Sequence, residues 1–367
     1  MRRDAHYHTC ASCGGVEVYH TKEAMLRCLF CHTTTPILKE KEVTYHPLEE
    51  AQEDLVLERS HEVSCMKCGA SFSVEASHFS LACPYCKTPL LLEPTHPLKP
   101  DRVLPFRVSK EDAQKAFKRW VGSLWFAPSA LSDSLKGEGK LKGCYVPHLV
   151  FRFKTHTRYS GERGEAYYVT VRRRVTDANG RSKEIEVQQR RIRWYPTHGE
   201  VKGSFRDLCV SASKEVNRQR VEALEPWSVG GAYDFNDAFL SGFEASEYTL
   251  SLSESFTYAK QKSQSSIERA IRADIGGDEQ RIHSKKTTYL QPAYLYVLFP
   301  LWRASFVWKK ESYEYMVHGV TAKVSGERPY SWLKITSTLI TLTLLAGGAY
   351  YLWQGQGVEM QDEKRWI

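Results

Sequence analysis

Two quartets of cysteines, set 55 residues apart, constrain this chain more than any other feature of its sequence. Each quartet is built as Cys-x2-Cys, fourteen residues, and Cys-x2-Cys again. The first contains Cys10, Cys13, Cys28 and Cys31, and the second contains Cys65, Cys68, Cys83 and Cys86. A spacing that recurs in this way describes two copies of one module.

Each quartet predicts a zinc site, because two Cys-x2-Cys knuckles supply the four thiolates that tetrahedral zinc accepts. A module of about 30 residues buries too little core to fold alone, so we expect two Zn2+ ions to supply folding free energy. A closed four-thiolate site has no open position for chemistry, which favours a structural role over a redox or catalytic one. The nearby His6, His8, His20 and His32 are expected to be surface residues.

The residues between the knuckles predict β-hairpins, and hence zinc ribbons. In the second copy, the alternating stretches 71–74 and 78–82 flank a short turn, and Gly69 follows the first knuckle, where a left-handed backbone is needed. His32 and Lys87 stand where zinc ribbons commonly have glycine. We therefore expect one ribbon over residues 1–35 and another over 62–93. A linker over 36–61 and a proline-rich linker over 94–105 should let the ribbons project from the rest.

Residues 106–331 predict a basic α+β domain with an antiparallel sheet, because runs of strands are interrupted by helices without a regular βα alternation. The expected helices follow Ser109 and Ser213, and a longer one ends at Gly276-Gly277. The turn DANG at 177–180 predicts a long arginine-rich hairpin. The whole fold expected is two small zinc ribbons of the β-hairpin type, this α+β domain and a C-terminal transmembrane helix.

The positive charge of the chain is concentrated in its middle, where residues 140–220 contain 19 Lys and Arg but 8 Asp and Glu. Six arginines should converge on the hairpin, where they form a candidate site for phosphate or anionic lipid. A solvated or internally paired surface is the alternative. These residues are Arg172, Arg173, Arg174, Arg190, Arg191 and Arg193.

Sequence patterns of an enzyme are not found. The phosphate-binding pattern GxxxxGK[ST] is absent, and GEGK at 137–140 lacks both its spacing and its final hydroxyl residue. A cluster of polar residues lies near Gly276: Asp274, Asp278, Glu279 and His283. A polar turn after the helix is favoured there over a metal or acid-base site. Cys144 and Cys209 lie in strand-like segments and are expected to be small buried side chains. We therefore expect no catalytic activity.

The C-terminal region predicts a membrane span over residues 332–354. Residues 335–353 contain no charge and no proline, and as a helix they would extend ~28 Å, close to the thickness of the hydrocarbon core. Trp332 and Trp353 would lie at the two headgroup zones. A buried core helix is the alternative. Residues 355–367 are too few for a domain, so the span should be a tail anchor.

Several further motifs, together with the cysteine knuckles, resemble a group of bacterial TFIIB-type zinc-ribbon proteins that are often labelled as primosomal-helicase-like. The resemblance covers most of residues 60–331 and rests on LWFAPSAL, YSGERGEAYYVT, RWYPTHGEV, LEPW, DIGGDEQRIHS, FPLWRASF and GERPYS. The helicase motifs that would justify the label are missing here. Membrane-anchored relatives are associated with flotillin-like (SPFH) and phage-shock membrane-stress proteins, which implies an adaptor role and protein partners of these kinds.

The function expected is a single-pass adaptor at the cytosolic face of the inner membrane. Its zinc ribbons would be partner-binding modules, and its N-terminal bulk would stay in the cytosol, where thiols remain reduced. The alternative is a nucleic-acid-binding protein that uses the ribbons and the arginine hairpin without helicase activity.

Overall fold

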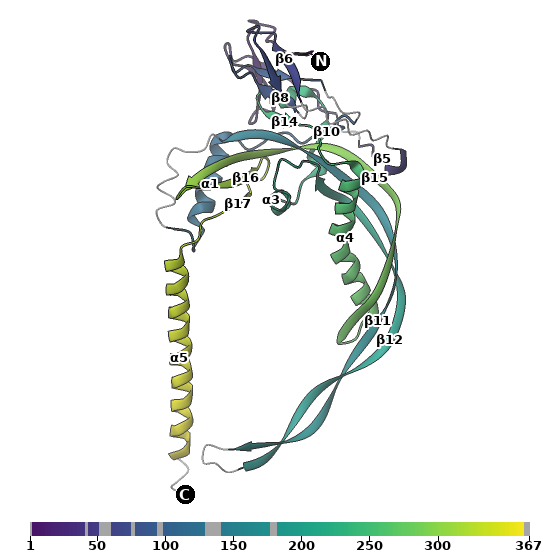
Figure 1. The fold of residues 1–367 in the computed structure, drawn as a ribbon, viewed down its shortest axis with the longest axis vertical. Helices are drawn as coiled ribbons and strands as arrows, with labels where there is room; N and C mark the ends of the chain where they lie inside the picture. The colour runs from purple at the N-terminus through teal and green to yellow at the C-terminus, as the bar shows by residue number, and fades with distance from the viewer. Residues whose placement is uncertain are drawn as a thin grey trace. The chain divides into compact units, whose positions relative to one another are not determined.

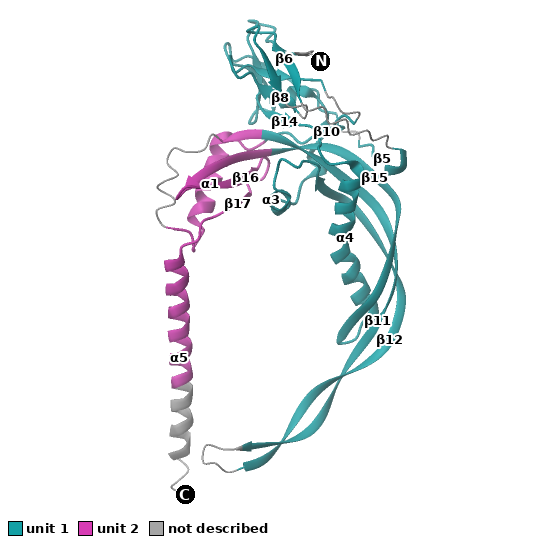
Figure 2. Ribbon diagram, viewed as in Figure 1, with its two compact units in different colours: residues 1–106, 144–300 teal, residues 107–143, 301–367 magenta. Residues whose placement is uncertain are grey.

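The computed structural model describes residues 2–40, 43–50, 60–74, 78–93, 98–128, 141–176 and 182–362. Several predicted features lie outside these ranges: the turn at 177–180, the GEGK stretch, most of the acidic part of the first linker and the last five residues. The chain forms two compact units (Figure 2): residues 1–106 with 144–300, and residues 107–143 with 301–367.

Three very long strands dominate the first unit (Figure 1). They are β11 (Lys142–Thr176), β12 (Ser182–Ser211) and β15 (Glu279–Trp308). β11 pairs with β12 in an antiparallel hairpin from His148↔Ser211 to Thr176↔Ser182, with one irregularity between Phe151 and Phe153. β15 lies on the other edge of β11. Thr157 and Thr287 hydroxyls lie 2.9 Å apart and those of Ser160 and Ser284 2.7 Å apart, so this pair is also antiparallel.

Glycine and proline lie within these long strands without interrupting them. Pro196 lies opposite Glu162 in the ladder. Among the described residues β12 pairs only with β11, so its edge position tolerates the missing proline donor. Gly161 lies where a Cβ atom would approach the carbonyl oxygen of Arg281 to 2.2 Å. Here glycine permits close approach of the two backbones rather than ending a strand.

Helix α4 (Leu252–Ile275) covers one face of this sheet. It begins at a capping box, in which Glu254 N–H donates to Ser251 Oγ (3.1 Å) and Ser251 N–H donates to Glu254 Oε2 (2.9 Å). It ends before Gly276, which has a φ of 65°. Its C-terminal end is as predicted. Its buried isoleucines pack on the hairpin in a cluster of Tyr159, Ile267, Ile271 and Ile275, with Val201, Phe205 and Ile282 against it.

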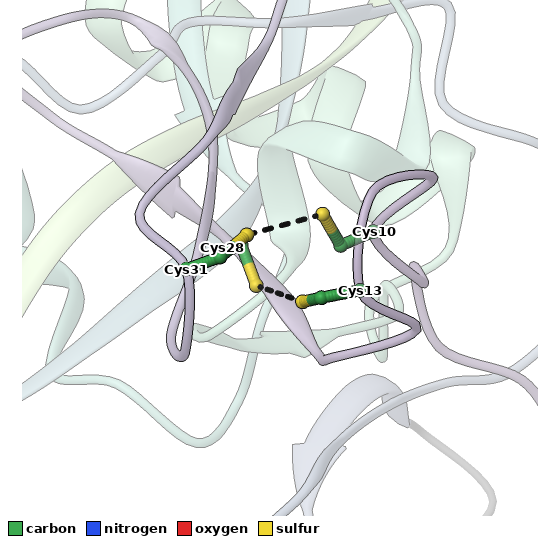
Figure 3. Close-up of side chains that lie close together, drawn as sticks. All are labelled: Cys10, Cys13, Cys28 and Cys31. Atoms are coloured by element: carbon green, nitrogen blue, oxygen red, sulfur yellow. Dashed lines mark hydrogen bonds between the residues drawn. The ribbon is translucent and has the colours of Figure 1, made fainter.

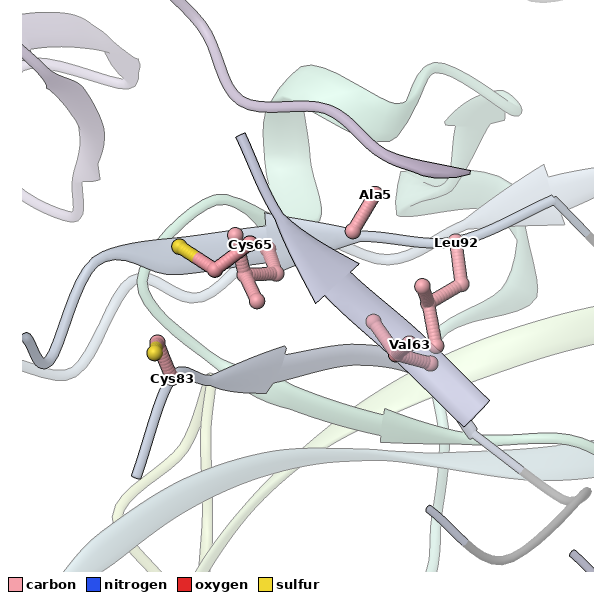
Figure 4. Packing of buried hydrophobic residues seen from close by; sticks show 6 residues of the cluster. Ala5, Val63, Cys65, Cys83 and Leu92 are labelled. Atoms are coloured by element: carbon pink, nitrogen blue, oxygen red, sulfur yellow. The ribbon is translucent and has the colours of Figure 1, made fainter. Parts of the chain in front are cut away.

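The second cysteine module is part of this same unit. Its strands are β6 (His61–Cys65), β7 (Ser71–Val74), β8 (His78–Ala82) and β9 (Pro89–Leu91). β8 pairs with β14 (Glu244–Ser246), which pairs with β11, so the module joins the central sheet. The N-terminal strand β1 (Arg2–Ala5) pairs with β6, and Ala5 packs with Val63, Cys65 and Leu92 (Figure 4). Residues 2–5 therefore belong to the second module rather than to the first.

The first module forms a separate small sheet of β2 (Glu17–His20), β3 (Met25–Cys28) and β4 (Thr34–Thr35). Tyr19 anchors it, because its backbone N–H donates to Ser241 O (2.9 Å) and its hydroxyl donates to Phe106 O (3.2 Å). The Tyr19 ring lies 5.5 Å from that of Phe239. The prediction that the ribbons project is therefore wrong, since buried aromatic and backbone contacts hold this module too.

The sheet of the first unit is mixed, which corrects the predicted antiparallel sheet. β10 (Arg102–Val103) pairs in parallel with β15, and β14 pairs in parallel with β11. Both short strands enter the sheet through long connections rather than hairpins, which permits parallel pairing. β10 also pairs with β13 (Tyr233–Asp234), and β5 (His46–Pro47) pairs with β15. The last part of the predicted proline-rich linker is thus a buried strand.

A short helix, α3 (Arg218–Ala223), replaces the helix expected after Ser213. Asn217 caps it by accepting from Arg220 N–H, whereas Ser213 Oγ accepts from Glu215 N–H at 3.1 Å. Two 3-10 turns, Val229–Gly231 and Asp237–Leu240, follow it, and a third, Leu48–Glu50, lies near the start of the chain.

The second unit contains α1 (Lys110–Gly122), β16 (Glu311–His318), β17 (Val324–Gly326), the end of β15 and α5 (Trp332–Asp362). Ser109 caps α1 as predicted, accepting from Asp112 N–H at 3.2 Å. The ring of Phe117 stacks on that of Tyr315, with 3.5 Å between their centroids. α1 thereby packs against the antiparallel strands of this unit.

Candidate metal centres

The first cysteine quartet forms a compact cluster of four sulfur atoms. Cys10 Sγ lies 3.6 Å from Cys31 Sγ, and Cys13 Sγ lies 3.4 Å from Cys28 Sγ (Figure 3). All four lie within 4.8 Å of one another. Cys10 and Cys28 are buried, while Cys13 and Cys31 are exposed. The structure thus brings together the four residues that the spacing selected.

The second quartet repeats this arrangement. Cys65 Sγ lies 3.7 Å from Cys86 Sγ, and Cys68 Sγ lies 3.9 Å from Cys83 Sγ, again with all four within 4.8 Å. The buried members are Cys65 and Cys83. The two modules therefore agree in geometry as well as in spacing.

The backbone shapes the knuckles in the same way in both modules. The N–H groups of Gly14 and Gly69 donate to the carbonyls of Cys10 and Cys65, at 2.9 and 2.8 Å. Both glycines have a φ of 73°. The residues after the other two knuckles, His32 and Lys87, adopt φ values of 60° and 61°. The left-handed turn therefore forms at all four knuckles, although a side chain there has a conformational cost of about 1 kcal/mol or more.

A threonine beside each quartet favours the thiolate form of one cysteine. Thr33 Oγ1 lies 3.2 Å from Cys31 Sγ, and this contact is the main cause that lowers the pKa of Cys31 to about 6. Thr88 Oγ1 lies 3.2 Å from Cys86 Sγ and lowers the pKa of Cys86 to about 6 in the same way. Each quartet thus contains one cysteine whose lowered pKa favours the thiolate, which is the form that ligates a cation.

The two quartets fit a tetrahedral metal ion. Four sulfur atoms at ~2.3 Å from zinc are separated from one another by about 3.8 Å, close to the paired distances in both modules. Each set could therefore hold a metal ion, and the all-sulfur donor set suits zinc. Ions bound in this way would link the two ends of each module and leave no coordination position for a substrate.

Large apolar side chains lie exposed between the cysteines of the two quartets. Leu29 and Phe30 are 56% and 67% exposed in the first module, and Met66 and Tyr85 are 69% and 67% exposed in the second. Lys67 Nζ lies 5.8 Å from the centre of the Phe30 ring. Knuckles of the two modules are therefore neighbours, and we call these four apolar residues the knuckle patch. Sequence reasoning did not select it, because only the fold brings the two knuckles together.

The six predicted arginines lie on the β11–β12 hairpin, but they do not form one cluster. Three have carboxylate partners: Arg172 Nε lies 3.4 Å from Glu186, Arg174 NH2 3.5 Å from Glu184 and Arg190 NH1 2.9 Å from Glu279. Arg193 lies over the ring of Tyr167, 5.1 Å from its centre. Among the residues that the structure describes, Arg173 and Arg191 have no ion pair.

The acidic residues near Gly276 do not converge on a metal site, as the reading of a polar turn expects. Asp274 accepts from the Tyr159 hydroxyl (2.5 Å), Asp278 accepts from Ala166 N–H (2.7 Å), and His283 lies 3.5 Å from Glu162. Within the described ranges, the two cysteine quartets are the groups whose geometry could hold a metal ion.

Cys209 is buried, as predicted, and burial raises its pKa to about 12, whereas Cys144 is partly exposed.

Two histidines expected on the surface contact one aspartate. His6 Nε2 lies 2.9 Å from Asp237 Oδ2, and His8 Nε2 lies 3.3 Å from Asp237 Oδ1. The contact with His8, supported by that with His6, lowers the pKa of Asp237 to about 2 despite partial burial. The contact ties the N-terminal segment to the short helix Asp237–Leu240. No sequence spacing could indicate it, because more than 220 residues separate the partners.

A groove of about 800 Å3 lies beside the central sheet and is lined by Tyr45, Arg152, Asp207 and Gln291, among others. Tyr45 donates to Asp207 Oδ1 at 2.7 Å, and the guanidinium of Arg152 lies 4.2 Å from the centre of the Tyr45 ring. These contacts join three of the polar side chains of the groove to one another.

The C-terminal helix is the candidate membrane span. Residues Trp332–Tyr351 are long and apolar enough to cross a bilayer, and none of this stretch is buried within the protein. A 20-residue helix extends about 30 Å, which matches a hydrocarbon core. Lys334, near its start, donates to Ala127 O at 2.8 Å. The alternative of a buried core helix does not fit this exposure.

No protein-family model matches the chain, and no solved structure matches it. The chain is similar to a Bacillus subtilis (strain 168) protein named uncharacterized protein YdjG. The two are 25% identical over 261 residues, which cover 69% of this chain and 70% of that protein. This likeness brings no substrate, ligand or partner with it.

Proposed function

We propose that the protein is a tail-anchored membrane adaptor whose two zinc-stapled modules bind a protein partner. Both quartets would hold zinc in a structural role, and α5 would span the inner membrane once, with the remaining chain in the cytosol. A reducing compartment suits eight thiolates that must stay free of disulfides. By the resemblance of the sequence, partners of the flotillin-like or phage-shock kind are the first to test.

The knuckle patch is the observation that supports protein binding. Its four side chains are large, apolar and more than half exposed, and an interface needs such anchors at its centre. The modules themselves have almost no net charge: residues 1–35 contain four basic and three acidic residues, and residues 62–93 contain two and three. Phosphate recognition needs clustered cations, so the composition favours protein over nucleic acid at this patch.

The alternative function, nucleic-acid binding, would use the zinc modules and the arginine hairpin, and of the two the hairpin is the better supplied with cations. Arg173 and Arg191 are the cations that favour it. Such binding would weaken steeply with salt and would survive removal of α5.

Removal of residues 332–367 is expected to move the protein from the membrane fraction to the soluble fraction. The helix supplies the only apolar segment of bilayer length in the described chain, and burying it in lipid is what would hold the protein there. The measurement is flotation and carbonate extraction of both forms.

A full-length variant with Leu342→Arg and Leu345→Arg gives an independent control for the truncation. Each arginine at the centre of a span costs about 3 kcal/mol on insertion scales, so this variant should also leave the membrane. Retention of the truncated protein in the carbonate-washed membrane would refute the anchor.

Leu29→Glu and Met66→Glu are each expected to reduce binding of the partner at least about tenfold. The added charge would lose its hydration when it is buried in the apolar centre of the interface. The matched control is Ser12→Glu, which places the same charge on an exposed residue between two ligand cysteines. Binding is measured by isotope-labelled mass spectrometry of proteins cross-linked to the full-length chain in membranes. The zinc content of each variant is measured in parallel. A set of cross-linked proteins that both patch variants and the control retain equally would contradict the proposal.

A further inference from the structure

The far part of the β11–β12 hairpin extends beyond the helix and strand that support its base. α4 ends at Ile275 and β15 begins at Glu279, and Figure 1 shows both ending well before the far end of the hairpin. The turn at 276–278, between α4 and β15, contacts the hairpin backbone through a hydrogen bond from Asp278 N–H to Gly164 O, at 2.9 Å. Beyond it, residues 167–176 and 182–191 pair with each other. A two-stranded hairpin is only marginally stable in water, so a second surface would stabilise it.

The two faces of this extension differ in chemistry. Residues directly opposite one another in an antiparallel pair share a face, so the register assigns each side chain. One face contains Arg172 opposite Glu186, Arg174 opposite Glu184 and Tyr168 opposite Arg190. All three of its arginines have glutamate partners. This face, which we call the paired face, is internally neutralised.

The other face is apolar and basic. It places Val171 opposite Val187, Arg173 opposite Ile185 and Tyr167 opposite Arg191. We call it the valine–arginine face; its members are Tyr167, Val169, Val171, Arg173, Val175, Lys183, Ile185, Val187, Gln189 and Arg191. Four apolar members are more than a third exposed, namely Tyr167 37%, Val175 42%, Ile185 38% and Val187 37%, while Val169 and Val171 are partly buried. Among described residues, none of its three cations, Arg173, Lys183 and Arg191, has an ion pair.

The valine–arginine face continues the face that α4 covers nearer the base. Tyr159 lies opposite Gly199 and Thr157 opposite Val201, on the same side as Tyr167 by the two-residue alternation of a strand. Tyr159 and Val201 pack against the isoleucines of α4. The apolar pattern thus extends past Ile275, where the covering helix ends. Apolar side chains that continue beyond the covering helix would be stabilised by another apolar environment.

We propose that the valine–arginine face binds an anionic lipid surface, with its apolar side chains at the acyl boundary and Arg173, Lys183 and Arg191 on lipid phosphates. This inference rests on the proposed membrane location. A strip from 167 to 175 is about 26 Å long at 3.3 Å per residue, which allows several headgroups to be contacted at once. Apolar side chains and cations on one face are the combination that interfacial elements use on anionic membranes.

Lipid fits this face better than nucleic acid. Single-stranded nucleic acid is held by aromatic platforms, and the exposed apolar members here are mainly β-branched aliphatic side chains without a π-face. The arginines with glutamate partners are on the opposite face, so they do not enlarge the phosphate-binding surface.

The test uses full-length protein reconstituted into vesicles of phosphatidylcholine alone or mixed with phosphatidylglycerol. An environment-sensitive NBD fluorophore is attached through a genetically encoded azide in place of Val171 and, as the matched control, Thr170 on the paired face. Quenching by nitroxides on the lipid chains reports burial in the bilayer. We expect a blue shift and quenching at 171 in the anionic vesicles and neither at 170.

Charge variants separate this role from a general effect of net charge. Each basic residue near an anionic surface is worth roughly fivefold in binding, so Arg173→Gln with Arg191→Gln should lower the ratio of lipid-bound to free hairpin about twenty-five-fold. Arg172→Gln with Arg174→Gln removes the same charge from the paired face and should change it far less.

The outcomes distinguish this inference from the proposed function. Protein that fails to float with either vesicle overturns the membrane location itself. Protein that floats, but whose fluorophore at 171 stays in water in both lipids, overturns the lipid-binding face alone. A shift at 171 that appears only when single-stranded DNA is added would assign the face to nucleic acid and also overturn the inference.

Discussion

Cys83→Ser is expected to release the ion of the second quartet and unfold the second module, reducing bound zinc from two ions to one. Cys83 is fully buried and packs in the cluster that contains Cys65 and Leu92. Structural zinc contributes about 10–16 kcal/mol to small modules near neutral pH, as much as the whole stability of many domains. Because β8 of this module pairs with β14, the loss should reach the central sheet. Zinc content by elemental analysis and amide exchange at β14 measure both effects.

Cys28→Ser in the first module is the informative comparison. Its quartet should also lose its ion, but β2, β3 and β4 form a sheet that does not pair with β14, so exchange at β14 should increase less than in Cys83→Ser. Cys144→Ser, outside both quartets, should leave two ions bound. Two ions retained by Cys83→Ser, or equal exposure of β14 in the two ligand variants, would contradict the structural role assigned to the second site.

The spacing of the cysteines predicts both candidate metal centres, because a four-ligand site closed by two short knuckles is a local property of the chain. The starts of α1 and α4 also depend on local sequence, since Ser109 and Ser251 cap them through residues three positions away. The lengths of β11, β12 and β15 are not local. Gly161 and Pro196 interrupt a strand in isolation, and only a neighbouring strand at the right distance makes them compatible with one.

The placement of the modules also depends on partners that are distant in sequence. Ala5 packs beside Val63, and Tyr19 bonds to Ser241 and Phe106, and no periodic pattern indicates these pairs. The arginines show the same limit. Their place on the hairpin follows from composition, but their division between a paired face and an unpaired one depends on the register of β11 with Glu184 and Glu186 of β12.

Gly161→Ala is expected to destabilise the protein by about 3 kcal/mol and to separate the start of β15 from β11. The added Cβ would lie 2.2 Å from the carbonyl oxygen of Arg281 and 3.2 Å from Ile275 Cδ1. The first contact is with backbone, which cannot rotate away as a side chain can. The measurement is the free energy of unfolding in urea, beside amide exchange of residues 279–284.

Gly230→Ala is the matched control, because a Cβ there would meet no atom within 4 Å. It should change the stability by less than about 1 kcal/mol, and the smaller entropy of the unfolded chain would make the change favourable. If Gly161→Ala were as stable as this control, β11 and β15 would not approach as closely as the structure has them. Since β15 and α4 support the base from which the valine–arginine face extends, the disruptive variant should also weaken lipid contact at position 171 while leaving both zinc ions in place.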